Sequence, residues 1–397
     1  MKVLFLTHTF PYPPTDGMRS TCYQLIKHVS RKHETALLSL IESDKELVHV
    51  PEIRKSCGKV ETVRHDTLRD PLRRIRNVIF ESMPFCVAQF QSEAFARKLA
   101  EMLREGRYDL VHFLSVNVAG YRSVLGGTPG LLFPHDAVSM QFSRTARREP
   151  NPLRKLYWMS QSAKMKFFEK TEMPLFAKTV VVSEVDRRWL AEFLPQISIP
   201  VIPGGVDPDH FKPGSWKEEF PSVLFRGVMN FVPNADAAVY FCKKILPLIR
   251  AEFRGLRVMI CGKDPTLAVR ALHDGRNVFV TGLVPDLRPY MGKASVHICP
   301  MRSGSGMKNK ILEAWAMEKP VVATSLAADG IDCEHGRNIL IADTPLTFAQ
   351  YVVQLLKDPE LRARLGKNGR EQALKKYTWT AVAAMFDEVY AGLVKKP

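Results

Sequence analysis

The residues best suited to chemistry gather in one segment, residues 298–324, which reads ICPMRSGSGMKNKILEAWAMEKPVVAT. A buried strand is expected to end at Pro300. The loop that follows contains Gly304 and Gly306, and a helix starts near Met307. Glycines let the backbone approach a ligand closely, and a helix N-terminus offers free N–H groups and the positive end of the helix dipole. The segment is therefore predicted to bind a diphosphate.

Charged side chains on the predicted helix extend this site. Lys308 and Lys310 add positive charge beside the helix N-terminus. Glu313 shares a helix face with Lys310, because residues three positions apart are neighbours on a helix. A carboxylate does not stabilise phosphate, but it can accept hydrogen bonds from two hydroxyl groups of a ribose. This arrangement suits a nucleoside diphosphate. The alternative is a helix with solvated lysines and one surface glutamate.

The elements that position these residues alternate between strands and helices. In the first half, short apolar runs predict strands at residues 3–7, 34–41, 110–114, 130–133 and 179–182. In the second half, strands are expected at residues 222–225, 256–261, 278–281, 296–299 and 320–323, with helices at residues 235–249 and 308–317. Such alternation is typical of βαβ units and parallel sheets.

The chain is long enough for two domains of this kind. We expect Rossmann-like domains over residues 1–200 and 217–376, joined by a linker rich in Gly and Pro over residues 201–216. An amphipathic helix follows from about Tyr377. Open parallel sheets bind ligands at the carboxyl ends of their strands, so both sheets are expected to direct their loops into a cleft between the domains.

Composition limits the partners of the chain. A formal net charge of +16 favours an anionic partner, and phosphate-bearing substrates explain it better than nucleic acid because no nucleic-acid-binding module is recognisable. The seven cysteines are widely spaced, which argues against a zinc site or a disulfide framework and fits a reducing cytoplasm. The N-terminal apolar run is too short for a signal peptide. We therefore expect a cytoplasmic protein, soluble or peripheral to the plasma membrane.

The run EAWAMEKPVVAT, residues 313–324, resembles the donor-binding motif of the family 4 retaining glycosyltransferases, which have the GT-B fold. The resemblance implies a UDP-sugar or GDP-sugar donor whose ribose is held by Glu313. Members of the family usually carry a second glutamate, which contacts the donor sugar, eight positions earlier. Ser305 stands there in this chain, so the identity of the sugar is left open.

The resemblance covers nearly the whole chain. It implies that Arg226 and Gly227, which end the first strand of the second domain, lie near the donor phosphates, and that Gly282 and Leu283 flank the base. The remaining predicted donor residues are Gly304, Ser305, Gly306, Met307 and Glu313 in the second domain and Gly17 in the first. The sequence Tyr-Thr-Trp at residues 377–379 resembles the start of a terminal helix that crosses back to the first domain, the expected acceptor domain.

In the first domain, Asp16 and Gly17 stand in the loop after the first strand, which in this fold lies over the donor diphosphate and the acceptor. Arg19 is predicted to face a phosphorylated acceptor. His135, with Asp136 after it, fits the cleft histidine that donates a hydrogen bond to the transferring sugar. A structural histidine that caps the next segment is the alternative.

The resemblance also implies a mechanism. Arg226, Lys310 and the helix N-terminus are expected to stabilise the leaving nucleoside diphosphate by electrostatics, without a metal ion. No residue stands out as a nucleophile, which suits a front-face mechanism with retention of configuration. His135, Arg226 and Lys310 are thus the predicted catalytic residues.

A narrower resemblance is carried by GMRSTCYQLIKHVSRKHE near the start, by His135-Asp136 and by GVMNFVPNADAAVYF. These runs are similar to the exosortase-associated sugar transferases of bacterial exopolysaccharide clusters. The expected acceptor is lipid-linked or a growing oligosaccharide. Two alternatives are a nucleotide-sugar 2-epimerase of the same fold and a non-catalytic GT-B subunit that binds a partner transferase.

Two stretches combine basic and apolar residues, 69–80 and 141–178. A basic helix with apolar residues at helical spacing is typical of an interfacial helix, so both stretches predict an anionic membrane surface as a further partner. The alternative is an ordinary domain helix with a solvated basic face.

Overall fold

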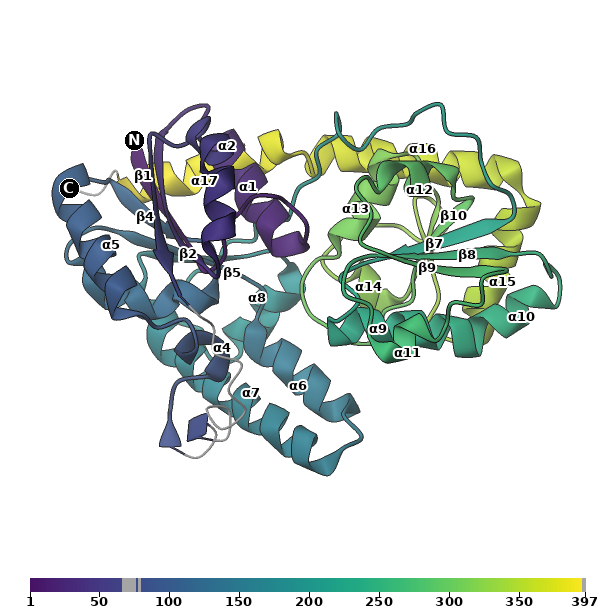
Figure 1. Cartoon of the computed structure of the whole chain (residues 1–397), viewed down its shortest axis with the longest axis horizontal. Coiled ribbons are helices and arrows are strands. Elements are labelled where there is room, and N and C mark those ends of the chain that lie inside the picture. Colours follow the sequence, from purple (N-terminus) through teal and green to yellow (C-terminus); the bar gives the residue numbers. More distant parts are fainter. Residues whose placement is uncertain (66–75, 78–79, 395–397) are drawn as a thin grey trace. The chain divides into compact units, whose positions relative to one another are not determined.

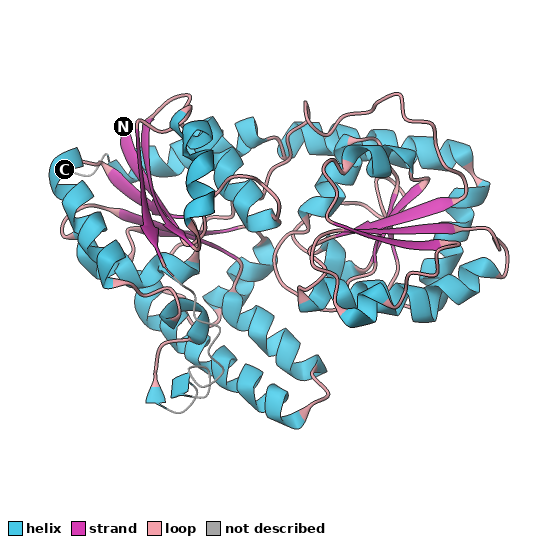
Figure 2. Cartoon of the chain, in the orientation of Figure 1, coloured by secondary structure: helices cyan, strands magenta, loops and turns pink. Residues whose placement is uncertain are grey.

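The structure, a computed structural model, describes residues 1–65, 76–77 and 80–394. Contacts divide the chain into two units. Unit 1 comprises Met1–Pro203 and the C-terminal segment from Trp379, and unit 2 comprises Gly204–Thr378. Each unit contains one six-stranded sheet with helices on both faces (Figure 1, Figure 2).

The sheet of unit 1 consists of β1 (Lys2–Thr7), β2 (Glu34–Ile41), β3 (Lys59–Arg64), β4 (Leu110–Phe113), β5 (Gly130–His135) and β6 (Lys178–Val181). Its strand order is β3-β2-β1-β4-β5-β6, and every neighbouring pair is parallel. This is the order of a Rossmann fold.

The sheet of unit 2 consists of β7 (Ser222–Arg226), β8 (Arg257–Cys261), β9 (Val278–Gly282), β10 (Val296–Cys299), β11 (Val321–Ala323) and β12 (Leu340–Ile341). Its order, β12-β11-β10-β7-β8-β9, repeats the Rossmann arrangement, again with parallel neighbours. The prediction of two Rossmann-like parallel sheets is confirmed.

The helices of unit 1 are α1 (Gly17–Val29), α2 (Val50–Arg54), α4 (Phe85–Ala88), α5 (Glu93–Gly106), α6 (Val138–Arg148), α7 (Pro152–Glu172), α8 (Glu184–Ala191) and α17 (Trp379–Val394). The described part of unit 1 also contains the 3₁₀ segments η1 (Asp44–His49), η2 (Val116–Leu125) and η3 (Met173–Leu175). The helices of unit 2 are α9 (Val232–Tyr240), α10 (Leu246–Arg250), α11 (Leu267–Arg270), α12 (Arg288–Lys293), α13 (Asn309–Ala316), α14 (Ser325–Ala328), α15 (Pro345–Lys357) and α16 (Pro359–Lys376).

The central strands form because they are almost entirely apolar. Val3, Leu4, Phe5 and Leu6 of β1 are fully buried, as expected for a parallel strand covered by helices on both faces. Two strands, β3 and β12, were not predicted from the sequence. β3, with the sequence KVETVR, is a polar edge strand, and β12 contains only two residues.

The predicted helix at residues 235–249 is interrupted in the structure. α9 runs into a π-helical turn, η4 (Phe241–Ile245), before α10 starts. Pro247 lies at the start of α10. Because proline lacks an N–H group and clashes with the preceding turn, a regular α-helix is interrupted there.

The C-terminal helix α17 packs on α1 and on the sheet of unit 1. The hydroxyl group of Tyr390 shares a buried hydrogen bond of 2.7 Å with Nδ1 of His112 on β4. Asp387 accepts hydrogen bonds from Nζ of Lys32, at 2.8 Å, and from Nε2 of His33, at 2.9 Å. These contacts tie the end of the chain to the first sheet. The predicted linker, residues 201–216, falls mostly in unit 2.

We predict that Tyr390→Phe lowers the free energy of unfolding by about 1–3 kcal/mol, because the substitution leaves Nδ1 of the buried His112 without its hydrogen-bond partner. Urea denaturation followed by circular dichroism measures the change. The matched control is Tyr351→Phe, whose hydroxyl group lies at the surface, 3.5 Å from His335. An equal loss in both variants contradicts the anchoring role of Tyr390.

Candidate functional site

The carboxyl ends of β7 and β10 lie side by side in the sheet of unit 2. Between these two strands the order of connection reverses, which makes this the topological switch point where open α/β sheets bind ligands. β7 ends at Arg226, β10 ends at Cys299, and α13 begins nine residues after Pro300 at Asn309. The segment that the sequence predicts to bind phosphate therefore lies at the switch point.

The loop between β10 and α13 depends on its glycines. Gly304 has a φ of 108° and Gly306 a φ of 66°, a backbone conformation that residues with a side chain rarely adopt. Lys308, the N-cap residue of α13, is buried and its Nζ donates hydrogen bonds of 2.5 Å to the carbonyl oxygens of Ser305 and Gly306. Lys308 thus closes the loop on itself instead of presenting its charge to a ligand.

Lys310 lies in the first turn of α13 and points toward the end of β7. Its Nζ donates a hydrogen bond of 2.7 Å to Oδ1 of Asn234 on α9 and lies 4.7 Å from the centre of the Phe225 ring. Burial lowers the pKa of Lys310 to about 8, because the charged ammonium is poorly solvated there. A bound anion relieves that cost.

Arg226 and Glu313 form an ion pair between Nη2 and Oε2. The two side chains are mostly buried, with exposed fractions of 21% and 13%. Burial lowers the pKa of Arg226 to about 10, so its guanidinium stays charged at neutral pH, a form that the Glu313 carboxylate also favours. Nε of Arg226 is buried and has no hydrogen-bond partner within the described residues. The Nε–H group of Arg226 is therefore a buried donor that its own unit leaves unsatisfied.

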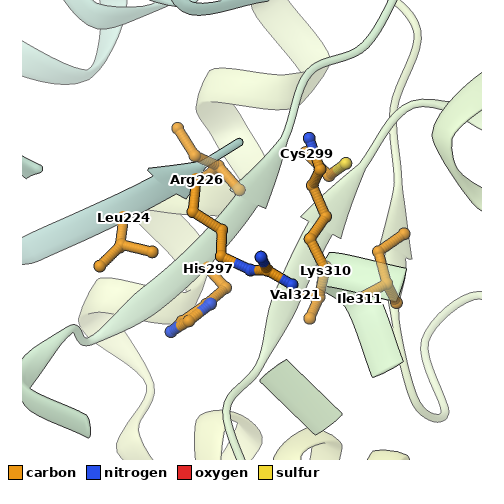
Figure 3. Close-up of a pocket in the computed structure, with 8 residues that line it drawn as sticks. Leu224, Arg226, His297, Cys299, Lys310, Ile311 and Val321 are labelled. Carbon is orange, nitrogen blue, oxygen red and sulfur yellow. The ribbon is translucent and has the colours of Figure 1, made fainter. Parts of the chain in front are cut away.

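Arg226 and Lys310 line a small cavity together with His297 and Cys299, as Figure 3 shows. The cavity has a volume of about 10 Å³, close to the minimum for one water molecule. His297 is buried and its Nε2 donates a hydrogen bond of 3.1 Å to the carbonyl oxygen of Met291. The cavity is too small for a nucleotide.

Two glycines bring the ends of β7 and β8 into close contact. A Cβ atom on Gly262 would lie 1.7 Å from the carbonyl oxygen of Gly227, and one on Gly227 would lie 2.6 Å from the amide of Asn234. Neither position has room for a side chain. Gly227 was predicted as a site residue from the sequence, whereas Gly262 and Asn234 were not.

The other predicted donor residues lie around this edge of unit 2. Gly282 ends β9 with a φ of 68°, and its carbonyl oxygen accepts a hydrogen bond of 3.1 Å from N of Gly262. Leu283 follows and is 65% exposed. Met307 lies beside Gly204, since its Cε is 3.0 Å from the position of a Cβ atom on that glycine.

His135 ends β5 of unit 1 with a φ of 69°. Its Nε2–H donates a hydrogen bond of 3.0 Å to the carbonyl oxygen of Leu114. Burial lowers the pKa of His135 to about 4, so the ring is neutral at pH 7 and Nδ1 carries no proton. In this state Nδ1 can only accept a hydrogen bond. The sequence analysis, in contrast, predicts that His135 donates one to the sugar.

His8, directly after β1, is a neighbour of His135 that the sequence patterns did not single out. Burial, followed by the charge of His135, lowers the pKa of His8 to about 4, and the Asp16 carboxylate acts in the opposite direction. One indication of a role for His8 was present in the sequence: it stands in the loop directly after the first strand.

Asp16 and Arg19 are engaged within unit 1. Asp16 is the N-cap of α1, and its Oδ1 accepts a hydrogen bond of 3.0 Å from N of Arg19. Nη2 of Arg19 donates to Oε1 of Glu46 at 3.0 Å. Gly17 is the first residue of α1, and a Cβ atom there would meet nothing within 4 Å. The structure therefore gives Asp16 a capping role and pairs Arg19 with two carboxylates.

Paired carboxylates are the usual ligands of divalent cations. The D-x-D sequence at residues 207–209 forms a turn, in which Oδ1 of Asp207 accepts hydrogen bonds from N of Asp209 and of His210, at 3.0 and 3.1 Å. Among the residues that the structure describes, no three His, Cys, Asp or Glu side chains are grouped as a candidate metal site.

Each half of the chain matches the model of a known protein family. Residues 15–210 match the model of Glycosyltransferase Family 4, and residues 220–358 match that of Glycosyl transferases group 1. The chain belongs to the glycosyltransferase family. A similar protein from Klebsiella pneumoniae, described as an uncharacterized 44.6 kDa protein in the cps region, is 22% identical over 370 residues, which are 90% of this glycosyltransferase and 91% of the relative.

Solved structures share the fold. The sucrose-phosphate synthase of Thermosynechococcus elongatus superimposes with a TM-score of 0.74 at 18% identity, over 99% of either chain. Anabaena Alr3699/HepE, solved in complex with UDP and glucose, gives a TM-score of 0.68 at 14% identity, over 98% of this chain and 99% of its own. At these identities the likeness shows the fold, and it confirms the predicted GT-B class.

Proposed function

We propose that this glycosyltransferase moves a sugar from a nucleoside-diphosphate donor to a lipid-linked or oligosaccharide acceptor in exopolysaccharide biosynthesis, with retention of configuration. One observation carries the proposal: Arg226, Lys310 and Glu313 converge where β7, β10 and α13 meet. The UDP and glucose in the solved Anabaena structure and the cps region of the Klebsiella relative support it.

The donor diphosphate binds beside the glycine loop, within reach of Lys310 and Arg226. Glu313 then releases Arg226 and accepts hydrogen bonds from the ribose hydroxyls, while the guanidinium turns to phosphate. This exchange replaces one anionic partner of Arg226 with another, so the mostly buried guanidinium is never left without a counter-charge. Gly282 and Leu283 flank the base, and Ser305 and Met307 lie on the side of the sugar.

In this proposal, the chemistry is electrostatic. As the bond from the anomeric carbon to the diphosphate breaks, negative charge accumulates on the leaving phosphate, and Lys310, Arg226 and the N-terminus of α13 stabilise it without a metal ion. His135 accepts a hydrogen bond from a sugar hydroxyl at Nδ1 and thereby orients the ring. Asp16 and Arg19 belong to the acceptor side, where the N-terminus of α1 suits a phosphorylated group. Gly17, in the same loop, belongs to the donor diphosphate.

We predict that the purified protein slowly releases UDP or GDP from one nucleotide sugar of a panel. Glu313→Ala and Glu313→Gln should lower kcat/KM for the donor by about 100-fold, because the hydrogen bonds from two ribose hydroxyls to a carboxylate are lost. A coupled assay for nucleoside diphosphate measures the rate, and circular dichroism confirms folding. Glu360→Ala, an exposed glutamate of the same unit, serves as the control and keeps the full rate.

Other outcomes identify the competing functions. Conversion of the free nucleotide sugar into its 2-epimer, without release of nucleoside diphosphate, indicates an epimerase. Absence of both turnover and donor binding indicates a non-catalytic subunit. A rate that EDTA abolishes and added Mg²⁺ restores contradicts the metal-independent mechanism.

Donor affinity should also depend on pH through Lys310. A bound diphosphate favours the charged ammonium, so the pKa of Lys310 rises above its value of about 8 when the donor binds. The dissociation constant is therefore flat below pH 8 and rises above it, by up to about tenfold per pH unit. Titration calorimetry between pH 7 and 9.5 measures this. Lys310→Gln should bind weakly and show no rise; an equal rise in the variant contradicts the assignment.

A further inference from the structure

α6 and α7 form a hairpin that is tied to unit 1 at its base (Figure 1). Glu169 on α7 is fully buried and accepts a hydrogen bond of 3.0 Å from N of Ser139 on α6, and a second one from its Oγ. Oγ of Ser162 donates to the carbonyl oxygen of Ser139 at 3.0 Å, and Oε1 of Gln161 accepts from N of Phe85 at 2.8 Å. The hairpin is thus a fixed part of unit 1.

The two faces of α7 differ in their surroundings. Gln161, Met165 and Phe168 are buried on the inner face. Four large apolar side chains, the apolar strip, are exposed, by 78% at Leu153, 63% at Leu156, 53% at Met159 and 61% at Phe167. At about 100° per residue these four fall within an arc of about 120°, opposite the buried residues. The strip therefore runs along one side of the helix.

Such a strip is unusual for a helix that only covers a domain. The outer face of a domain helix is normally polar, and contiguous exposed apolar surface marks a contact with another partner. Leu175, in η3 directly after α7, is 53% exposed as well. The prediction of a plain solvated basic face does not account for these side chains.

The charge around the strip indicates what covers it. Residues 138–172 contain eight Lys and Arg and three Glu, and one of these glutamates, Glu169, is buried. The exposed cations lie at the end of α6, at the start of α7 and further along it: Arg147, Arg148, Arg154, Lys155, Lys166 and Lys170. A second copy of this chain would bring two cationic hairpins together, which costs electrostatic energy. An anionic surface is favoured instead.

We propose that the α6–α7 hairpin docks on an anionic lipid membrane, with the apolar strip inserted among the acyl chains near the head groups and the surrounding cations in contact with those head groups. A helix with apolar side chains on one side and cations beside them lies in the membrane interface. No helix among the described residues is both long and apolar enough to cross a bilayer. The other predicted membrane stretch, residues 69–80, lies largely outside the described residues.

Vesicle flotation tests the proposal independently of sugar transfer. The full chain should float with phosphatidylcholine vesicles that contain 30% phosphatidylglycerol, remain unbound with phosphatidylcholine alone, and dissociate at high salt. The triple substitution Leu153→Ser, Leu156→Ser and Phe167→Ser should lower the bound fraction by more than about tenfold. Arg147→Glu with Arg148→Glu should lower it by roughly tenfold.

Control variants carry changes of the same kind on unit 2. Leu267→Ser with Leu346→Ser removes two exposed leucines, 83% and 58% exposed, and Lys243→Glu with Lys244→Glu reverses two exposed cations. Both should float like the unmodified chain, and circular dichroism checks the fold of every variant. Absence of flotation with anionic vesicles, or equal losses in the unit 2 controls, overturns the proposal. Dimerisation that the triple substitution abolishes in light scattering assigns the strip to a second copy instead.

Discussion

The candidate site depends on two positively charged side chains, Arg226 and Lys310, that are buried at one edge of the sheet of unit 2. Arg226 and Lys310 are held where β7, β10 and α13 meet, and burial lowers the pKa of both, to about 10 and about 8. With the Glu313 carboxylate beside Arg226, the three side chains carry one net positive charge. Because the charge is poorly solvated, it raises the free energy of the protein without ligand. The same low solvation strengthens its attraction to an anion that binds there. The site is thus arranged for a negatively charged ligand.

The surrounding fold holds these charges in place. The Rossmann strand order brings the carboxyl ends of β7 and β10 together at the switch point. Gly227 and Gly262 allow the ends of β7 and β8 to touch, and Asn234 fixes the Lys310 ammonium from α9. Lys308 closes the glycine loop by bonding to its carbonyl oxygens. Gly227, Gly262, Asn234 and Lys308 therefore serve mainly to position the Arg226 and Lys310 side chains.

The sequence predicted the parts that depend on local pattern. Buried parallel strands such as β1 are continuous apolar runs. Gly304, Gly306, Lys310 and Glu313 follow one such strand within a short segment, so their place at one sheet edge could be predicted. The edge strand β3 was missed because its exposed face is charged, and β12 because two residues carry no pattern. Contacts between distant residues were also out of reach: Asn234 meets Lys310 across 76 positions, and the carbonyl oxygen of Leu114 fixes the proton of His135 on Nε2.

A crystal structure with bound UDP or GDP tests the central claim most directly, namely that Arg226, Lys310 and Glu313 form the donor site. The account predicts phosphate oxygens within about 3 Å of Nζ of Lys310 and of the Arg226 guanidinium, the Glu313 carboxylate on the ribose hydroxyls, and the Arg226–Glu313 ion pair broken. A nucleotide bound elsewhere, with that ion pair intact, contradicts it.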